Sequence, residues 1–278
     1  MKLYFVTDQE GVAGVLDWHY AEGKFTDSGN RLLLDEVRAA LDGARKFGQL
    51  EATVLQGHHT SCLDELEAPD VRVVRVNEGT WPFQLDSSFD GLLFIGQHSM
   101  AETPKGHLCH TMNGAIREIR LNGRVIGEIG LWVYLAASVG VPTIFLSGDH
   151  AACEEAKLLV PGITAASVKQ GLSIHRADHL APAVACEKIR SGVVQAMECL
   201  RSGTIAVLEC AAEWTLEIEM VPQRTVVETY EIQDQQGEGV EKINRSTIRM
   251  HGAALPELLK RRRNIRIWKT VGPVEERC

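Results

Sequence analysis

The chain has 278 residues, 45% of them hydrophobic and 24% charged, which suits one large α/β domain or two medium ones. This composition argues against disorder. The formal net charge of -8 and a pI near 5.7 exclude a general nucleic-acid-binding surface, because phosphate binding needs a clustered positive field.

Short apolar runs alternate with a helical pattern in the first part of the chain. Strands are predicted at residues 3–8, 52–57, 71–76 and 91–96, and a helix is predicted at 28–47. Ser28 is suited to cap the start of that helix, and Gly48 follows its end. Because the apolar strands are nearly continuous and alternate with helices, the fold class is α/β, with a mostly parallel sheet covered by helices.

A hairpin and a buried strand are predicted next. Residues 117–128 alternate in polarity around Asn122-Gly123, the strongest local signal for a tight hairpin turn. The following uncharged stretch, 129–148, is long enough to span a membrane. Gly140 and Pro142 divide it, so we interpret it as a buried helix followed by a buried strand and expect no membrane span.

The pattern changes in the last third of the chain. Helices are predicted from about residue 151 and at 182–200, and residues 213–221 then alternate strictly between apolar and polar. Residues 225–232 are predicted as the neighbour of that strand. These features predict a smaller α+β C-terminal part, and we divide the chain into a larger α/β domain at 1–165 and a second domain at 166–278, with a soft boundary.

Cysteine usage and the N-terminus bear on the compartment. The seven cysteines are scattered and never form CxxC, which suits reduced thiols better than a disulfide framework or a thiolate zinc site. The chain runs from Met1 directly into a predicted strand, without the ordered segments of a signal peptide. We therefore expect a cytoplasmic protein.

Polar residues follow three of the predicted strands. Asp8 and Glu10 end the first, His58 and His59 follow the second, and His98 follows "LLFIGQ". Parallel strands present their carboxyl ends at one edge, where α/β sheets bind ligands. Imidazole and carboxylate without thiolate suit a catalytic divalent metal, whereas helix capping or ribose binding is the alternative for the carboxylates.

Two further positions stand out. Residues 99–114 form a long segment without periodicity, typical of functional or mobile loops, and they include His107 and His110. Glu128 opens an otherwise apolar helix, where a favourable charge near the helix N-terminus is the simpler explanation.

These residues occur within a set of motifs that resembles a known family. The motifs are "TDQEG", "GHH", "LFIGQH", "CHTM" and "IGEIGLWVYLA", continuing through "LSGDHAACEEA" and "AASVKQG". Their order and spacing are similar to those of the DppA-like zinc-dependent D-aminopeptidases, a metallopeptidase family. The resemblance covers residues 1–175 well and the C-terminal part loosely.

The resemblance implies a site with two Zn²⁺ ions per chain. By position it implies five metal ligands and one catalytic histidine that does not bind metal, and these are Asp8, Glu10, His59, His98 and Glu128 as ligands and His110 as the catalytic group. It also implies a ring-like homo-oligomer, a decamer being one candidate state.

We therefore expect a zinc aminopeptidase that hydrolyses the N-terminal residue of short peptides, with D-amino-acid peptides as candidate substrates. Gln56, Gly57 and His58 depart from the family's usual sequence, and His58 is an alternative ligand to His59. An amidohydrolase acting on a small non-peptide amide and a non-catalytic oligomeric binding protein are the alternatives. We expect no nucleic-acid or membrane partner.

Overall fold

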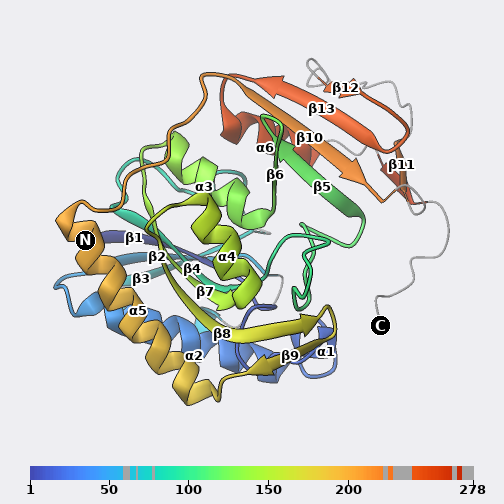
Figure 1. Ribbon diagram of the computed structural model, residues 1–278. Helices are drawn as coiled ribbons and strands as arrows, with labels where there is room; N and C mark the ends of the chain where they lie inside the picture. Colours follow the sequence, from blue (N-terminus) through green and yellow to red (C-terminus); the bar gives the residue numbers. More distant parts are fainter. Residues whose placement is uncertain are drawn as a thin grey trace.

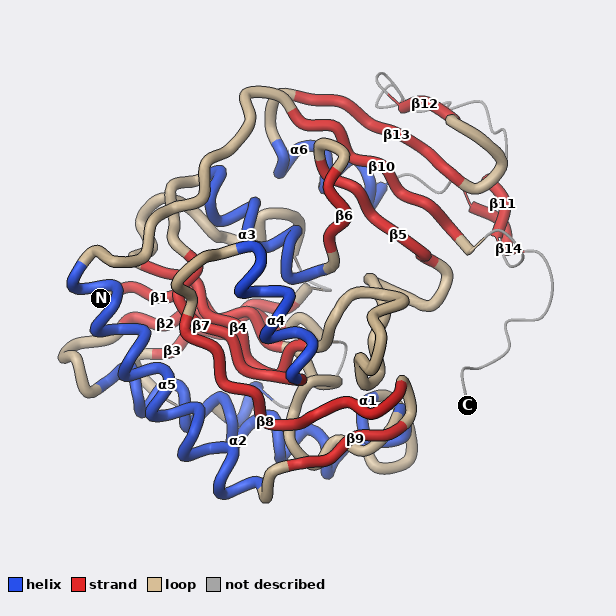
Figure 2. Tube along the Cα trace, viewed as in Figure 1, coloured by secondary structure: helices blue, strands red, loops and turns tan. Residues whose placement is uncertain are grey.

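The computed structural model describes residues 1–58, 63–66, 68–76, 79–221, 225–227, 240–264 and 268–270. Within them the chain forms a larger, mostly parallel sheet and a smaller antiparallel sheet, and the smaller one lies above the larger one in the views of Figures 1 and 2. The predicted α/β class with an antiparallel C-terminal part is confirmed. No helix among the described residues combines the length and the apolar character needed to cross a membrane.

The larger sheet has seven described strands. In spatial order they are β3 (Val71–Arg75), β2 (Glu51–Gln56), β1 (Lys2–Thr7), β4 (Gly91–Gln97), β7 (Thr143–Asp149), β8 (Thr164–Ser173) and β9 (Arg176–His179). All neighbours are parallel except β9, which runs antiparallel to β8. The chain adds β2 and β3 on one side of β1 and then crosses to add β4 on the other side. A topological switch point therefore lies between β1 and β4.

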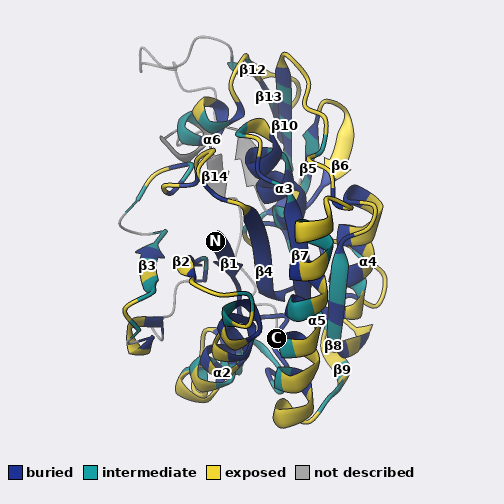
Figure 3. Ribbon diagram, turned by 90° about the vertical axis from the view of Figure 1, so that its left-hand side faces the viewer, coloured by how far each residue is buried: buried dark blue, intermediate teal, exposed yellow. Residues whose placement is uncertain are grey.

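Helices cover both faces of this sheet. Helices α2 (Thr26–Arg45) and α5 (Pro182–Ser202) pack on one face, and α3 (Glu128–Ser138) and α4 (His150–Leu159) pack on the other (Figure 1). Leu3 and Phe5 of β1 belong to the first of these two cores, whereas Tyr4 and Val6 belong to the second. The inner strands β1, β2, β4 and β7 are consequently buried along most of their length, as a parallel sheet covered on both faces requires, whereas the edge strands β3 and β9 are partly exposed (Figure 3).

The smaller sheet joins distant parts of the chain. Its order is β12 (Val240–Lys242), β13 (Thr247–Gly252), β10 (Trp214–Met220), β5 (Ile116–Leu121) and β6 (Arg124–Ile126), and α6 (Leu255–Asn264) packs beside it. The remaining described elements are α1 (Trp18–Ala21), a 3₁₀ turn at Leu63–Glu65, and a two-stranded sheet of β11 (Thr225–Val227) and β14 (Trp268–Thr270). The division into domains at residue 165 stays a prediction.

Two local predictions need correction. The helix predicted at 28–47 begins at Thr26, and Phe25 precedes it without a side-chain cap, so Ser28 lies within the first turn. The neighbours of β10 are β13 and β5, whereas residues 225–227 pair with β14. Strand pairing between distant segments is set by tertiary packing, which local alternation does not report. The predicted hairpin is confirmed, with positive φ at both Asn122 and Gly123.

Candidate metal centre

Asp8 directly follows β1, at the switch point of the larger sheet. His98 directly follows β4, and His58 lies two residues beyond β2, so three adjacent parallel strands deliver polar side chains to one edge. Ligands of open α/β sheets bind at this place, outside the carboxyl ends of the strands. The topology therefore brings together residues that are about 40 to 90 positions apart in the sequence.

A glycine allows the ends of β1 and β4 to approach closely. Gly96 has a φ of +78°, and a Cβ built on it would lie 2.1 Å from the carbonyl oxygen of Asp8. Its own carbonyl accepts a hydrogen bond of 2.8 Å from the N–H of Gly11. Only a residue without a side chain fits this contact, which fixes the main chain on both sides of Asp8.

The two carboxylate oxygens of Asp8 face two different histidines. Oδ1 lies 3.4 Å from Nδ1 of His58, and Oδ2 lies 3.3 Å from Nε2 of His98. Nδ1 of His58 is also 3.2 Å from Oε2 of Glu10, and Nε2 of His98 is 3.4 Å from Oε1 of Glu128. Asp8 thus stands between two groups of nitrogen and oxygen atoms.

Backbone carbonyls orient the imidazole rings. Nε2–H of His58 donates to the carbonyl of Ala21 at 3.1 Å, and Nδ1–H of His98 donates to that of Ser99 at 2.9 Å. A carbonyl oxygen only accepts, so in a neutral ring the other nitrogen turns a lone pair toward the carboxylates. This arrangement of a second hydrogen bond behind the ring is typical of histidines that bind metal.

The residues present fit a divalent cation. Oε2 of Glu10 is buried and accepts no hydrogen bond of good geometry from the described residues. Lone pairs and carboxylates at 3.2–3.4 Å repel one another unless the rings are protonated or a cation lies among them. Among the residues that the structure describes, three combinations place one ligand atom from each member within 4.8 Å of the others. They are Asp8–Glu10–His98, His98–His110–Glu128 and Glu10–Glu22–His58. Nitrogen and oxygen ligands without thiolate suit catalytic zinc.

Electrostatics at the centre are dominated by burial and by the carboxylates. Burial opposes charge on His58, but Glu10 and Asp8 raise its pKa to about 11. Burial likewise opposes charge on Asp8, yet hydrogen bonds from His58 and His98 hold its pKa well below the usual range. Glu128, where burial is again outweighed by His98, has a pKa lowered to about 2. The carboxylates of Asp8 and Glu128 are therefore ionised, which is the form that binds metal.

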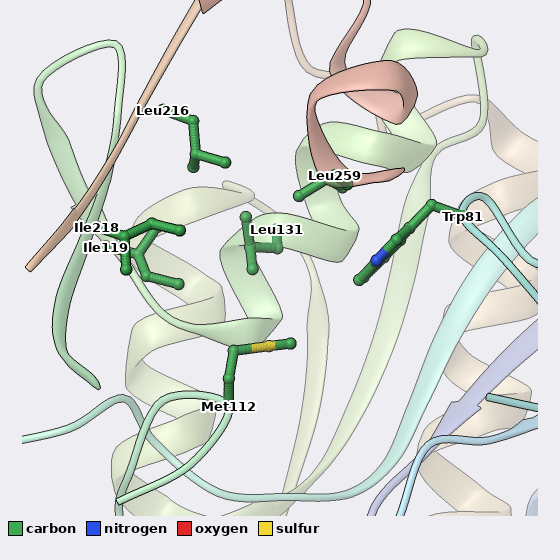
Figure 4. Close-up of a pocket in the computed structure, with 7 residues that line it drawn as sticks. All are labelled: Trp81, Met112, Ile119, Leu131, Leu216, Ile218 and Leu259. Atoms are coloured by element: carbon green, nitrogen blue, oxygen red, sulfur yellow. The ribbon is translucent and has the colours of Figure 1, made fainter. Parts of the chain in front are cut away.

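Glu128 also binds the loop that leads into strand β5 of the smaller sheet. It is the first residue of α3, and its Oε1 accepts a hydrogen bond of 2.7 Å from the N–H of Met112. The side chain of Met112 points into an apolar hollow between α3, β5, β10 and α6 (Figure 4). The hollow is lined by Trp81, Met112, Ile119, Leu131, Leu216, Ile218 and Leu259. Met112 therefore links the apolar packing around α3 to the candidate centre, because its main chain binds Glu128 and its side chain lines the hollow.

His110 lies at the rim of the centre. Its ring stacks on His98 with the centroids 4.0 Å apart, and the edge of Trp18 approaches it at 5.4 Å. Nδ1–H donates to the carbonyl of Leu108 at 3.0 Å, so Nε2 faces Glu128 at 3.9 Å. His107, in the same loop, points elsewhere and contacts the carbonyl of Leu16 and the side chain of Lys169.

The structure brings most of the predicted site residues together. Asp8, Glu10, His98, His110 and Glu128 converge on one centre. His59 lies outside the described residues, and its role stays a prediction, while its alternative His58 occupies the centre. Glu22, at the end of α1, was not foreseen, and no local pattern marks it.

Comparisons with known proteins show which family the chain is similar to. A family model described as D-aminopeptidase, peptidase family M55, matches residues 1–262. A D-aminopeptidase of Bacillus subtilis (strain 168) is 33% identical over 201 residues, which is 66% of this chain and 69% of the relative. The solved structure of the Zn-dependent D-aminopeptidase DppA from Bacillus subtilis, described as a self-compartmentalizing protease, superimposes with a TM-score of 0.83 at 26% identity, covering 94% of this chain and 95% of that chain.

Proposed function

The chain belongs to the D-aminopeptidase family of metallopeptidases, and on that premise we propose that it is a zinc-dependent enzyme that removes the N-terminal residue from short peptides. The observation that carries the proposal is Asp8, whose two oxygens face His58 on one side and His98 on the other. The relative and the solved neighbour, described as D-aminopeptidases, support D-aminoacyl peptides as the substrate class.

We propose two zinc ions per chain, sharing Asp8. Glu10 with His58, or with its neighbour His59, would complete one position, and His98 with Glu128 would complete the other. Asp8 would help to hold both ions, because its two oxygens face the two groups of ligand atoms separately. Bound zinc would supply Lewis-acid chemistry at this place, for the scissile carbonyl and for the attacking water.

His110 is proposed as the group that moves a proton. Its Nδ1–H is committed to the carbonyl of Leu108, so a neutral ring has its lone pair on Nε2, toward Glu128. That nitrogen can accept a proton as the water attacks and return it to the leaving amine. Stacking on His98 and the edge contact with Trp18 hold the ring plane in place during both transfers.

The assembly and the compartment are also proposed. The solved neighbour is described as self-compartmentalizing, which supports a ring-like homo-oligomer for this chain. Leu16 and Leu172 expose 48% and 45% of their surface and are available for contacts between subunits. The described cysteines are free thiols, which supports a reducing, cytoplasmic location.

Elemental analysis combined with a substrate panel tests the proposal. Purified protein is loaded with zinc, desalted and measured by plasma mass spectrometry, with chelator-treated protein as the control. We expect about two zinc ions per chain and hydrolysis of dipeptides with an N-terminal D residue faster than of their L counterparts. Absence of retained zinc, or hydrolysis of simple amides alone, would contradict the proposal.

A further inference from the structure

The segment that carries Glu10 has no regular secondary structure. Residues 9–16 run as turns and bends between β1 and α1, yet most of them are buried. Side chains from distant elements bind the backbone of this segment. Glu36 of α2 accepts a hydrogen bond of 2.9 Å from the N–H of Ala13, and Nδ1 of His179 in β9 accepts one of 3.1 Å from that of Gly14.

Lys169 of β8 makes the most extensive of these contacts. Its ammonium group has three N–H donors and three acceptors within reach. It donates to the carbonyl of Glu10, to that of Val15 at 3.3 Å, and to Nδ1 of His107 at 3.0 Å. The side chain of Lys169 therefore joins both ends of the segment that follows Asp8.

The contact with His107 fixes the tautomer of that ring. An ammonium only donates, so Nδ1 of His107 accepts, and Nε2–H donates to the carbonyl of Leu16 at 3.1 Å. Burial and the charge of Lys169 lower the pKa of His107 to about 3, which keeps the ring neutral. Through His107, Lys169 is therefore also linked to the carbonyl of Leu16 in the same segment.

A lysine at this place is costly for folding alone. Lys169 is only 2% exposed, and burial lowers its pKa to about 8 although Asp149, Glu10 and Glu36 favour the charged form. Buried ionic groups are commonly replaced by apolar residues without loss of stability, or even with a gain. The lysine is therefore better explained by the geometry that it imposes on the segment than by its contribution to the core.

We propose that Lys169 is a positioning residue that holds the main chain of Glu10 and thereby sets the affinity of the centre for metal. The inference rests on the proposed function, because it requires Glu10 to be a ligand. Lys169 itself binds the carbonyl of Glu10, leaving the carboxylate to face His58. Groups that orient metal ligands in this way typically change metal affinity 10- to 100-fold when they are removed.

The test compares Lys169→Met with Lys188→Met. Lys188, on α5, also donates to a backbone carbonyl of β8, that of Ser167 at 2.8 Å, but it is exposed and its bond does not go to the segment of Glu10. Zinc affinity is measured by competition with a chromophoric chelator, and the site geometry by the visible absorption of the cobalt(II)-loaded protein. We expect zinc affinity to fall about 10- to 100-fold and the cobalt spectrum to change in Lys169→Met only.

The metal-free variants are compared by circular dichroism and thermal unfolding, which separates loss of positioning from loss of fold. A folded Lys169→Met protein with the zinc affinity and cobalt spectrum of the wild type would overturn the proposal. If that variant does not fold, His107→Phe replaces it, because this change removes one acceptor of Lys169 while keeping the lysine. Unaltered zinc affinity in folded His107→Phe would equally overturn the proposal, whereas a wild-type protein that binds no zinc would refute the proposed function itself.

Discussion

Oδ2 of Asp8 and Nε2 of His98 lie 3.3 Å apart across the junction of β1 and β4. The two strands pair in parallel, with Thr7 opposite Ile95, so both residues leave the sheet at the same edge. Their proximity follows from the crossover of the chain at this point. The candidate centre is thus built on the rigid part of the fold, with loops completing it.

Replacing Asp8 with asparagine should remove the bound metal. Asparagine keeps the shape of the side chain but lacks the charge that both proposed positions share. We expect zinc content to fall from about two ions per chain to less than one, and peptidase activity to fall to that of the chelator-treated protein. The control is Asp90→Asn, whose carboxylate binds the N–H of Lys2 at the opposite end of β1. Full zinc content in Asp8→Asn would contradict the assignment.

Replacing His110 with alanine should separate metal binding from chemistry. The ring lies beside the centre, with Nε2 3.9 Å from Glu128, and is proposed to transfer a proton. We expect kcat to fall by about 10²- to 10⁴-fold while zinc content stays unchanged. Zinc loss in this variant would show that His110 is a ligand.

The adjacent histidines after β2 can be told apart by single substitutions. Nδ1 of His58 lies 3.2 Å from Glu10 and 3.4 Å from Asp8, so we expect His58→Ala to lower the zinc content by about one ion per chain. The measurement is zinc analysis of His58→Ala and His59→Ala side by side. Loss of zinc in His59→Ala alone would instead confirm the ligand that the family resemblance implies.

Gly96→Ala should displace the main chain of Asp8 and so lower both the stability of the protein and its affinity for zinc. The added Cβ would lie 2.1 Å from the carbonyl oxygen of Asp8, in addition to the strain of the positive φ. Gly162 also has a positive φ, +88°, but a Cβ added there would meet nothing within 4 Å, so Gly162→Ala measures the strain alone, about 1–2 kcal/mol. We expect Gly96→Ala to cost on the order of 3 kcal/mol in chemical denaturation and to weaken zinc binding. Equal effects of the two substitutions would show that the backbone relaxes around the contact.

Glu36 should make stability depend on pH. Burial raises the pKa of this carboxyl from 4.5 to about 8, and the N–H of Ala13 and the charge of Lys169 offset only part of the shift. Between these values the native state holds a proton that the unfolded state has lost. Stability that is present below pH 4.5 is therefore lost as the pH rises toward 8.

Glu36→Gln should reduce that slope by up to about 1.4 kcal/mol per pH unit, since glutamine does not titrate. Denaturation midpoints at several pH values measure it, with the exposed Glu51→Gln on β2 as the control. A slope that is the same in Glu36→Gln and in the wild type would show that Glu36 is ionised in the native state.

The sequence was informative where structure is set locally. The buried strands of the larger sheet read as continuous apolar runs, and the alternation of residues 213–221 matches the alternating burial of β10. Asp8, Glu10 and His98 were recognisable because each stands just beyond such a strand. Parallel strands present such residues at one edge of the sheet, and in the structure the three side chains lie close together.

Long-range relationships were not accessible in the same way. Residues 225–232 alternate between apolar and polar, as a neighbour of β10 is expected to do. One of the two places beside β10 is instead occupied by β5 of the hairpin at Ile116–Ile126. Lys169 stands in the motif "AASVKQG" as a single charge in a strand, and only the fold reveals that it reaches the carbonyl of Glu10. A single lysine within an otherwise uncharged, buried strand is the sequence feature that indicates such a contact.

The pairing of β5 with β10 affects the order in which parts of the chain can fold during synthesis. Ile119 lies opposite Ile218, so the strand that follows the loop of His110 finds one of its partners almost a hundred residues later. On the ribosome, Asp8 and His98 emerge early, while β5 must wait for β10 before it is paired on that side. No proposed zinc ligand lies beyond Glu128, yet the loop that carries His110 leads into a strand whose partner β10 is synthesised only in the last third of the chain.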